Sequence, residues 1–176
     1  MNKNNQVNKS KINKYQKYIL KSNILINELL NQGFKTVYDQ LYSHVTTNEE
    51  LYDIKSKCNT ESIICVGGSD DVNNLLLVSC GSCLDILTIT DRFVPKLING
   101  AYWYFTPDIS FGFSPNSKID QNYYDCYDCP NCNDNSNICT DSNRLSWKLS
   151  GYTGFRLGKN CGNAIPSTNR KIILLK

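Results

Sequence analysis

Beyond residue 62 the apolar residues of this chain fall into short runs, and residues that favour turns separate those runs. No long stretch of helical periodicity lies between them, which argues against a parallel sheet with connecting helices. The sequence therefore predicts a mainly β domain over residues 62–176, folded as an antiparallel sandwich or a jelly roll. The predicted strands are residues 63–67, 75–80, 84–90, 101–106, 110–114, 144–149, 154–158 and 171–175.

The N-terminal part has a different pattern. Residues 1–10 are predicted to be a disordered tail, and residues 11–61 a basic helical extension. Apolar residues recur at helical spacing from Lys11 to about Tyr42, and Gly33 divides this stretch into two predicted helices. We expect these helices to pack on the β domain, with a homo-oligomer contact through them as the alternative.

Charge is distributed unevenly along the chain. Residues 1–35 hold seven lysines and one acidic residue, a charge of +6, and the remainder carries −3, which together give the net charge of +3. A basic arm can bind an acidic partner, nucleic acid or anionic lipid. These lysines are not interleaved with arginines and stacking aromatics as in single-strand binders, so nucleic acid is not expected. A solvated helix face is the preferred interpretation, and an adaptor for an acidic partner is the alternative.

Nine cysteines give the most specific chemical signal. Cys126, Cys129, Cys132 and Cys139 form a C-x2-C-x2-C-x6-C pattern within a predicted loop over residues 116–143. Four thiolates this close could bind zinc in tetrahedral geometry. Cys80 and Cys83 could instead combine with Cys126 and Cys129 as a split four-cysteine site.

Disulfides are the competing interpretation of these cysteines. A long polar loop gains stability from cross-links because they lower the entropy of the unfolded chain. The polar start of the sequence lacks the apolar segment of a secretory signal, which indicates cytoplasmic synthesis and argues against the usual route to disulfides. No apolar stretch is long enough for a membrane span. The sequence thus leaves zinc, disulfides and no cofactor at all as alternatives.

Two further groups of residues bear on function. His44 is the only histidine, so every catalytic arrangement based on histidine would have to use this one residue. In the predicted strand over residues 101–106, Tyr102 and Tyr104 share one face, and Trp103 and Phe105 share the other. We expect the tryptophan and phenylalanine in the core, and we treat the two tyrosines as candidate ligand-binding residues for a protein or glycan partner.

Several motifs of the β domain occur together in a fixed order: Ile64-Cys-Val-Gly-Gly-Ser-Asp, Asn99-Gly-Ala-Tyr-Trp-Tyr, Ser110-Phe-Gly-Phe-Ser-Pro, Asn143-Arg-Leu-Ser-Trp-Lys-Leu and Gly154-Phe-Arg-Leu-Gly. This set resembles an uncharacterised β module of giant DNA virus and protist proteins, over about residues 62–176. Lys148 stands where that module often has histidine, and Phe155 where it has tyrosine or tryptophan. The resemblance implies a β fold and a viral origin, carries no activity, and would allow disulfides to form in a viral cytoplasmic factory.

The sequence therefore predicts a non-enzymatic binding or structural module, such as a virion or host-contact protein, that recognises its partner through the loops between strands. One alternative is a metal- or thiol-dependent protein that uses the cluster from Cys126 to Cys139. The other is the adaptor that binds an acidic partner through the basic arm.

Overall fold

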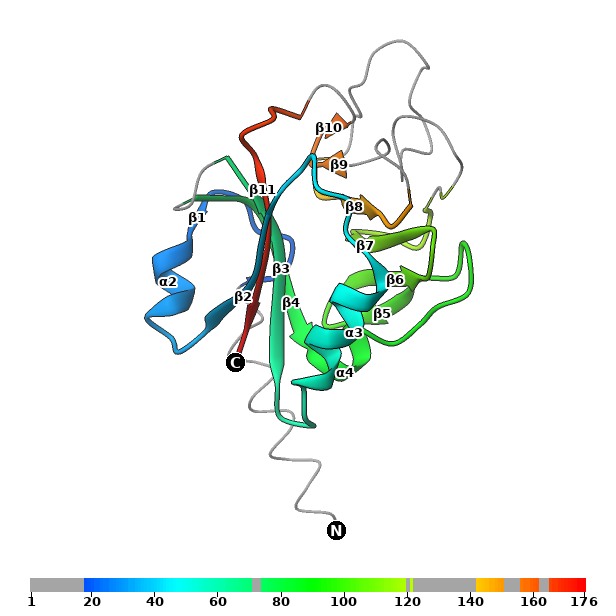
Figure 1. Cartoon of the computed structure of the whole chain (residues 1–176), viewed down its shortest axis with the longest axis horizontal. Coiled ribbons are helices and arrows are strands. Elements are labelled where there is room, and N and C mark those ends of the chain that lie inside the picture. Colours follow the sequence, from blue (N-terminus) through cyan, green and yellow to red (C-terminus); the bar gives the residue numbers. More distant parts are fainter. Residues whose placement is uncertain (1–17, 71–73, 120, 122–141, 151–155, 162–164) are drawn as a thin grey trace.

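The computed structural model describes residues 18–70, 74–119, 121, 142–150, 156–161 and 165–176. Strands account for 42% of the described residues and helices for 15%, so the prediction of a mainly β fold is confirmed. The strands form two antiparallel sheets, neither of which closes on itself (Figure 1). The helices are short, and their bounds are Ile26–Leu30 for α2, Asn48–Ser56 for α3 and Cys83–Ile86 for α4.

The first sheet brings together strands from both ends of the described chain. Its spatial order is β1, β4, β3, β11, β2, so that β11 pairs with β3 on one side and with β2 on the other. The bounds in that order are Ile24–Leu25, Asn74–Ser82, Ile63–Ser69, Arg170–Leu175 and Lys35–Leu41.

The second sheet is a meander, in which strands adjacent in space are also consecutive in the sequence. Its order is β5, β6, β7, β8, β9, β10, with bounds Lys96–Ile98, Ala101–Thr106, Ser110–Ser114, Leu145–Lys148, Arg156–Leu157 and Asn160–Cys161. Asn99 and Gly100 join β5 to β6, and both have positive φ angles (51° and 83°). This is the conformation that a two-residue hairpin turn requires, and it accounts for the Asn-Gly pair.

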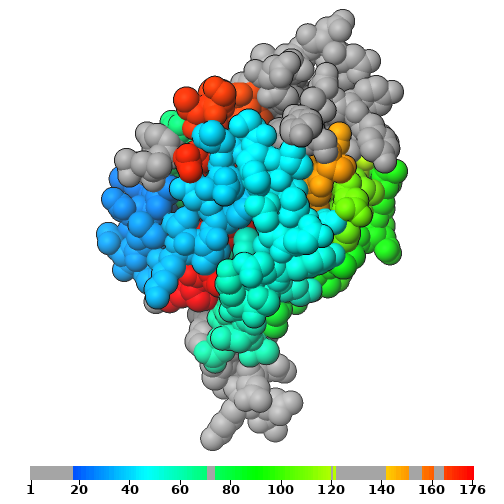
Figure 2. Space-filling model, in the orientation of Figure 1, coloured from blue at the N-terminus to red at the C-terminus, as the bar shows by residue number. Residues whose placement is uncertain are grey.

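The main core lies between the two sheets and is rich in aromatic side chains. Trp103, Phe105 and Trp147 are fully buried there, and for Trp103 and Phe105 the alternation along the strand predicted this. The rings of Trp103 and Phe113 lie 4.9 Å apart, and the ring of Phe111 lies 5.6 Å from that of Trp147. Helix α3 adds Leu51 and Ile54 to this core, and Figures 1 and 2 show the helix on the front of the molecule.

A second core lies on the other face of the first sheet. Tyr18, Ile26, Leu29 and Phe34 pack there against Cys65, Val78, Cys80, Ile172 and Leu174. Residues 18–34 therefore cover the first sheet rather than forming a separate basic extension.

Two predictions of secondary structure are wrong. Residues 34–42 have apolar residues at helical spacing, but residues 35–41 form β2 because they pair with β11 along the edge of the first sheet. Residues 84–90 were predicted as a strand, but α4 begins at Cys83 and buries Cys83, Ile86 and Leu87 at helical spacing. The helical extension over residues 11–61 thus reduces to α2 and α3 within the described part, and residues 1–17 lie outside it.

Candidate functional site

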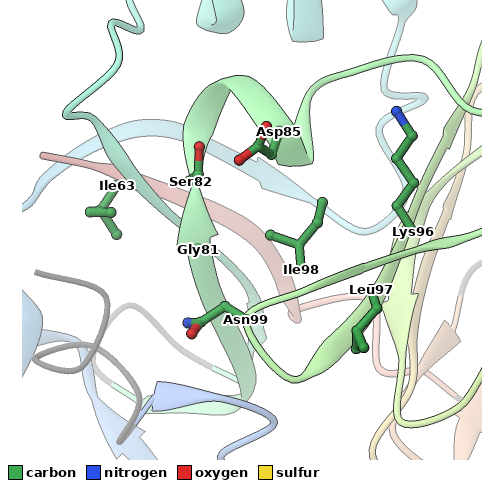
Figure 3. Close-up of a pocket in the computed structure, with 8 residues that line it drawn as sticks. All are labelled: Ile63, Gly81, Ser82, Asp85, Lys96, Leu97, Ile98 and Asn99. Atoms are coloured by element: carbon green, nitrogen blue, oxygen red, sulfur yellow. The ribbon is translucent and has the colours of Figure 1, made fainter. Parts of the chain in front are cut away.

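A cavity of about 540 Å³ lies between the two sheets at the edge formed by β5 (Figure 3). Ile63 of β3, Gly81 and Ser82 of β4, and Asp85 of α4 form one wall. The other wall is formed by β5 and by Asn99 of the following turn. This volume falls within the roughly 300–1,000 Å³ that ligand-binding pockets occupy.

Two features fix the arrangement of the chain beside this cavity. The side-chain amide of Asn99 donates a hydrogen bond to the Cys80 carbonyl oxygen (3.0 Å), which links the two sheets beside the cavity. Gly81 allows α4 and β5 to approach β4 closely: a Cβ at this position would lie 3.0 Å from Ile86 Cδ1 and 3.3 Å from Ile98 Cγ2. The missing side chain and the linking hydrogen bond together shape the space.

The cavity combines apolar walls with two opposite charges. Figure 3 shows Lys96 and Ile98 on one side of β5 and Leu97 on the other. The side chains of Asp85 and Lys96 are exposed, and within the described residues they form no ion pair with each other. A ligand that enters this space meets apolar surface from Ile63 and Ile98, one carboxylate and one ammonium group.

The segment between α4 and β5, together with β5 itself, exposes apolar side chains, and one of them, Leu97, lines the cavity. Ile89, Phe93, Val94 and Leu97 are between 44% and 61% exposed. Phe93 has a φ of 62°, a left-handed conformation that is costly for a bulky side chain. The structure thus holds an aromatic ring half-exposed on a strained backbone.

Gln121 holds this strained segment in place. It is fully buried, and its Oε1 accepts a hydrogen bond from the Phe93 amide (2.6 Å). Its Nε2 donates to the hydroxyl oxygens of Thr106 (3.0 Å) and Ser110 (2.9 Å) in the second sheet. Arg92 Nη2 donates to the Gln121 carbonyl oxygen (2.8 Å). The conformation of Phe93 is therefore fixed from the interior of the protein.

The predicted cysteine site is only partly within the described residues. Cys126, Cys129, Cys132 and Cys139 lie outside them, together with most of the predicted loop. Cys80 forms a disulfide with Cys65, its direct partner across β3 and β4, and Cys83 forms one with Cys58. The structure therefore does not form the predicted split four-cysteine metal site, because Cys80 and Cys83 are both in disulfides and neither offers a thiolate.

No other metal site is found in the described part of the chain, where no three His, Cys, Asp or Glu side chains come together as ligands. Among the helices of that same part, none has the length and apolar character needed to cross a membrane.

The two candidate tyrosines differ in their surroundings. Tyr104 is fully buried, and its hydroxyl donates a hydrogen bond to the Leu145 carbonyl oxygen (3.1 Å). The prediction that it lines a ligand surface is therefore wrong. Tyr102 is half-buried and lies opposite Leu97, so that its side chain shares the outer face of the sheet with this exposed leucine.

A buried polar cluster surrounds Lys171 on β11. Its ammonium group donates to the carbonyl oxygen of His44 (2.6 Å) and to the hydroxyl of Thr46 (3.1 Å). Burial lowers the pKa of Lys171 to about 7, and Glu50 opposes this effect. The Tyr38 hydroxyl lies 2.9 Å from Thr46 Oγ1.

His44 itself is half-buried and lies 2.8 Å from a Glu50 oxygen, while Glu50 also caps α3 with Thr47. Because Lys171 is completely buried, a substrate cannot reach its amino group. We interpret this cluster as structural: it ties β11 to the segment that leads into α3.

The sequence favours a turn at the Asn-Gly pair beside the cavity but does not indicate the cavity itself. The Asn99-Gly100 pair marks the turn, whereas the walls come from segments up to 36 residues apart, from Ile63 to Asn99. The exposed apolar run Phe93-Val-Pro-Lys-Leu was the available signal. No protein-family model, curated protein or solved structure matches the chain.

Proposed function

We propose that the protein is a non-enzymatic binding module for a protein partner. Its recognition surface would consist of the cavity beside β5 and the neighbouring exposed side chains of Phe93, Val94 and Leu97. We call these three residues together with the cavity the β5 surface.

The observation that carries this proposal is the support that Gln121 gives to Phe93. A residue in a strained conformation persists only where its surroundings hold it, and such residues cluster at functional sites. Here a buried glutamine that makes three side-chain hydrogen bonds keeps an aromatic ring 44% exposed. Exposed aromatic and aliphatic side chains beside a cavity are typical of the central residues of protein interfaces.

A peptide-display selection tests the proposal. Random twelve-residue peptides would be selected on the wild-type protein and measured against a variant with Phe93→Ser, Val94→Ser and Leu97→Ser. We expect the selected peptides to lose affinity by at least about tenfold, since each lost apolar contact costs on the order of 1 kcal/mol.

The matched control is a variant with Leu25→Ser, Leu30→Ser and Leu41→Ser, which are similarly exposed (54%, 37% and 42%) but belong to β1, α2 and β2. This variant should keep wild-type affinity, and thermal unfolding would verify that both variants are folded. Selected peptides that bind all three proteins equally, or a selection that yields no binder, would contradict the proposal.

The resemblance to a viral β module suggests a virion or host-contact protein as the setting for this binding. The alternative functions rest on the cysteines from Cys126 to Cys139 and on the basic arm. Both involve residues outside the described part of the chain, so the β5 surface is the better supported candidate.

A further inference from the structure

We infer that the β5 surface binds its partner as an extended peptide strand. The strand pairs with the free edge of β5, places one apolar side chain in the cavity and brings one acidic side chain to Lys96. This inference rests on the proposed function and specifies the ligand of the same surface.

The hydrogen-bonding pattern leaves one residue of β5 free to pair. Among the described strands, β5 ends the second sheet and pairs only with β6, where Lys96 lies opposite Trp103 and Ile98 opposite Ala101. The Phe105 amide donates to Thr90 Oγ1 (3.1 Å) and its carbonyl accepts from the Thr90 amide (2.8 Å), both on the side of β6 away from β7.

The direction of the backbone N–H and C=O groups alternates along a strand. Those of Trp103 and Ala101 in β6 therefore also point away from β7, and they form hydrogen bonds with Lys96 and Ile98. The N–H and C=O groups of Leu97 therefore point away from β6. They are directed toward the free edge of the sheet.

An added strand would place its side chains in a defined order. The residue that pairs with Leu97 points to the outer face, as Leu97 itself does, and its two neighbours point inward. One neighbour then lies beside Ile98 and Ile63, where an apolar side chain fits the walls of the cavity. The other lies beside Lys96, whose ammonium group has no ion-pair partner in the described structure and would pair with a carboxylate.

The short edge makes this pairing selective. β5 has three residues and follows Pro95, which has no N–H group, so the backbone offers two hydrogen bonds at Leu97. Binding therefore depends on the two inward side chains as well. Pairing with β5 of a second copy would place Ile98 opposite Lys96, which leaves the ammonium group without an acid and disfavours that occupant.

Titration of the ¹⁵N-labelled protein with acetyl-Thr-Leu-Val-Glu-Thr-amide, followed by NMR, tests this inference for an antiparallel strand. The reversed peptide acetyl-Thr-Glu-Val-Leu-Thr-amide tests it for a parallel strand. We expect one of the two to bind with millimolar affinity or better and to shift the amide signals of Ser82, Leu97 and Ile98.

Backbone pairing is tested by N-methylation of the peptide. In the antiparallel peptide, a methyl group on the central valine nitrogen removes the donor to the Leu97 carbonyl oxygen, so binding should be lost. In the same peptide, a methyl group on the leucine nitrogen points away from β5 and serves as the matched control, which should retain binding. In the parallel peptide the two positions exchange roles, because there the leucine nitrogen is the donor to the Leu97 carbonyl oxygen.

Charge variants test the side-chain order. Lys96→Gln should weaken peptide binding by up to about fivefold, because it removes an ion pair. Asp85→Asn should strengthen it, because the Asp85 carboxylate repels the glutamate across the same cavity. Replacing the glutamate of the peptide by lysine should reverse the direction of both effects.

The outcomes separate this inference from the proposed function. If display-selected peptides depend on Phe93, Val94 and Leu97 but neither N-methylation nor Lys96→Gln changes peptide binding, the strand inference is wrong and the binding module stands. Failure of both pentapeptides to bind at millimolar concentration also overturns the strand inference. Self-association through β5 would overturn it as well. Such self-association would be detected by sedimentation and abolished by Leu97→Pro.

Discussion

The hydroxyl group of Tyr104 lies over Gly112, its direct partner on the neighbouring strand of the second sheet. A Cβ at Gly112 would lie 2.7 Å from that hydroxyl oxygen and 2.1 Å from the Leu145 carbonyl oxygen. The glycine therefore makes room for the tyrosine, and the tyrosine hydroxyl in turn donates to the Leu145 carbonyl oxygen.

Gly112→Ala should lower the free energy of unfolding by about 1–3 kcal/mol, the usual cost of overpacking a buried site. Tyr104→Phe should lower it by about 1 kcal/mol through loss of the hydrogen bond. Urea unfolding would measure both values. Tyr102→Phe is the matched control on the same face of β6 and should be nearly neutral; equal effects of the two tyrosine variants would contradict the assigned hydrogen bond.

The second core predicts that α2 is required for stability. Leu29 is completely buried, whereas its neighbour Leu30 is 37% exposed. Leu29→Ala should therefore destabilise the protein by about 2–5 kcal/mol, and Leu30→Ala by less than about 1 kcal/mol. Urea unfolding of the two variants checks this difference. A stable Leu29→Ala protein would show that the first sheet does not need this cover.

The two disulfides should each contribute about 3 kcal/mol, as expected for loops of this size. They close loops with sequence separations of 25 and 15 residues. Replacing Cys58 and Cys83 together by alanine, or Cys65 and Cys80 together, should lower the urea midpoint accordingly. Peptide mapping without reductant should recover both linked pairs, and recovery of Cys80 linked to a residue in 126–139 would refute the pairing.

Lys171 should make stability depend on pH. Burial lowers the pKa of this lysine from its usual 10.5 to about 7. Between these values the unfolded chain binds more protons than the native protein, so the stability increases as the pH rises. Relative to Lys171→Met, the wild type should gain up to about 4 kcal/mol from pH 7 to pH 10, and the change should level off about one pH unit below the native pKa.

Urea unfolding of both proteins at each pH gives this difference directly. Burial raises the pKa of Tyr38 and of Tyr42, which lowers stability above pH 10, but both proteins share this effect and it cancels. Lys159→Met changes an exposed lysine and serves as the control. Its free energy of unfolding should depend on pH in the same way as that of the wild type. If the free energy of unfolding of Lys171→Met also followed that of the wild type at every pH, the buried amine would have its ordinary pKa.

The sequence predicted those strands whose alternation matches a single buried face. β6 and β7 follow this pattern closely, with Trp103, Phe105, Phe111 and Phe113 inward. β2 was missed because Phe34, Val37, Tyr38 and Leu41 also fit a helix, and only pairing with β11, more than 120 residues away, decides between the two. Local periodicity cannot report a contact at that separation.

The candidate site could not be predicted for a related reason. Its walls come from β3, β4, α4 and a strand of only three residues, and no local pattern links Ile63 to Lys96. The role of Gln121 could not be predicted from the sequence either. It depends on hydrogen bonds to Phe93 and to residues of two different strands, which no local pattern indicates. The Asn99-Gly100 turn was predictable because its cause is local: both residues need positive φ angles.

The position of β11 between β2 and β3 sets the order in which the protein can be completed during synthesis. β2 leaves the ribosome early but has no neighbour in its sheet until residues 170–175 emerge. The meander from β5 to β10 pairs strands close in sequence and can form sooner. We therefore expect the second sheet to assemble first, and β2 to join the fold only when the last strand is inserted beside it.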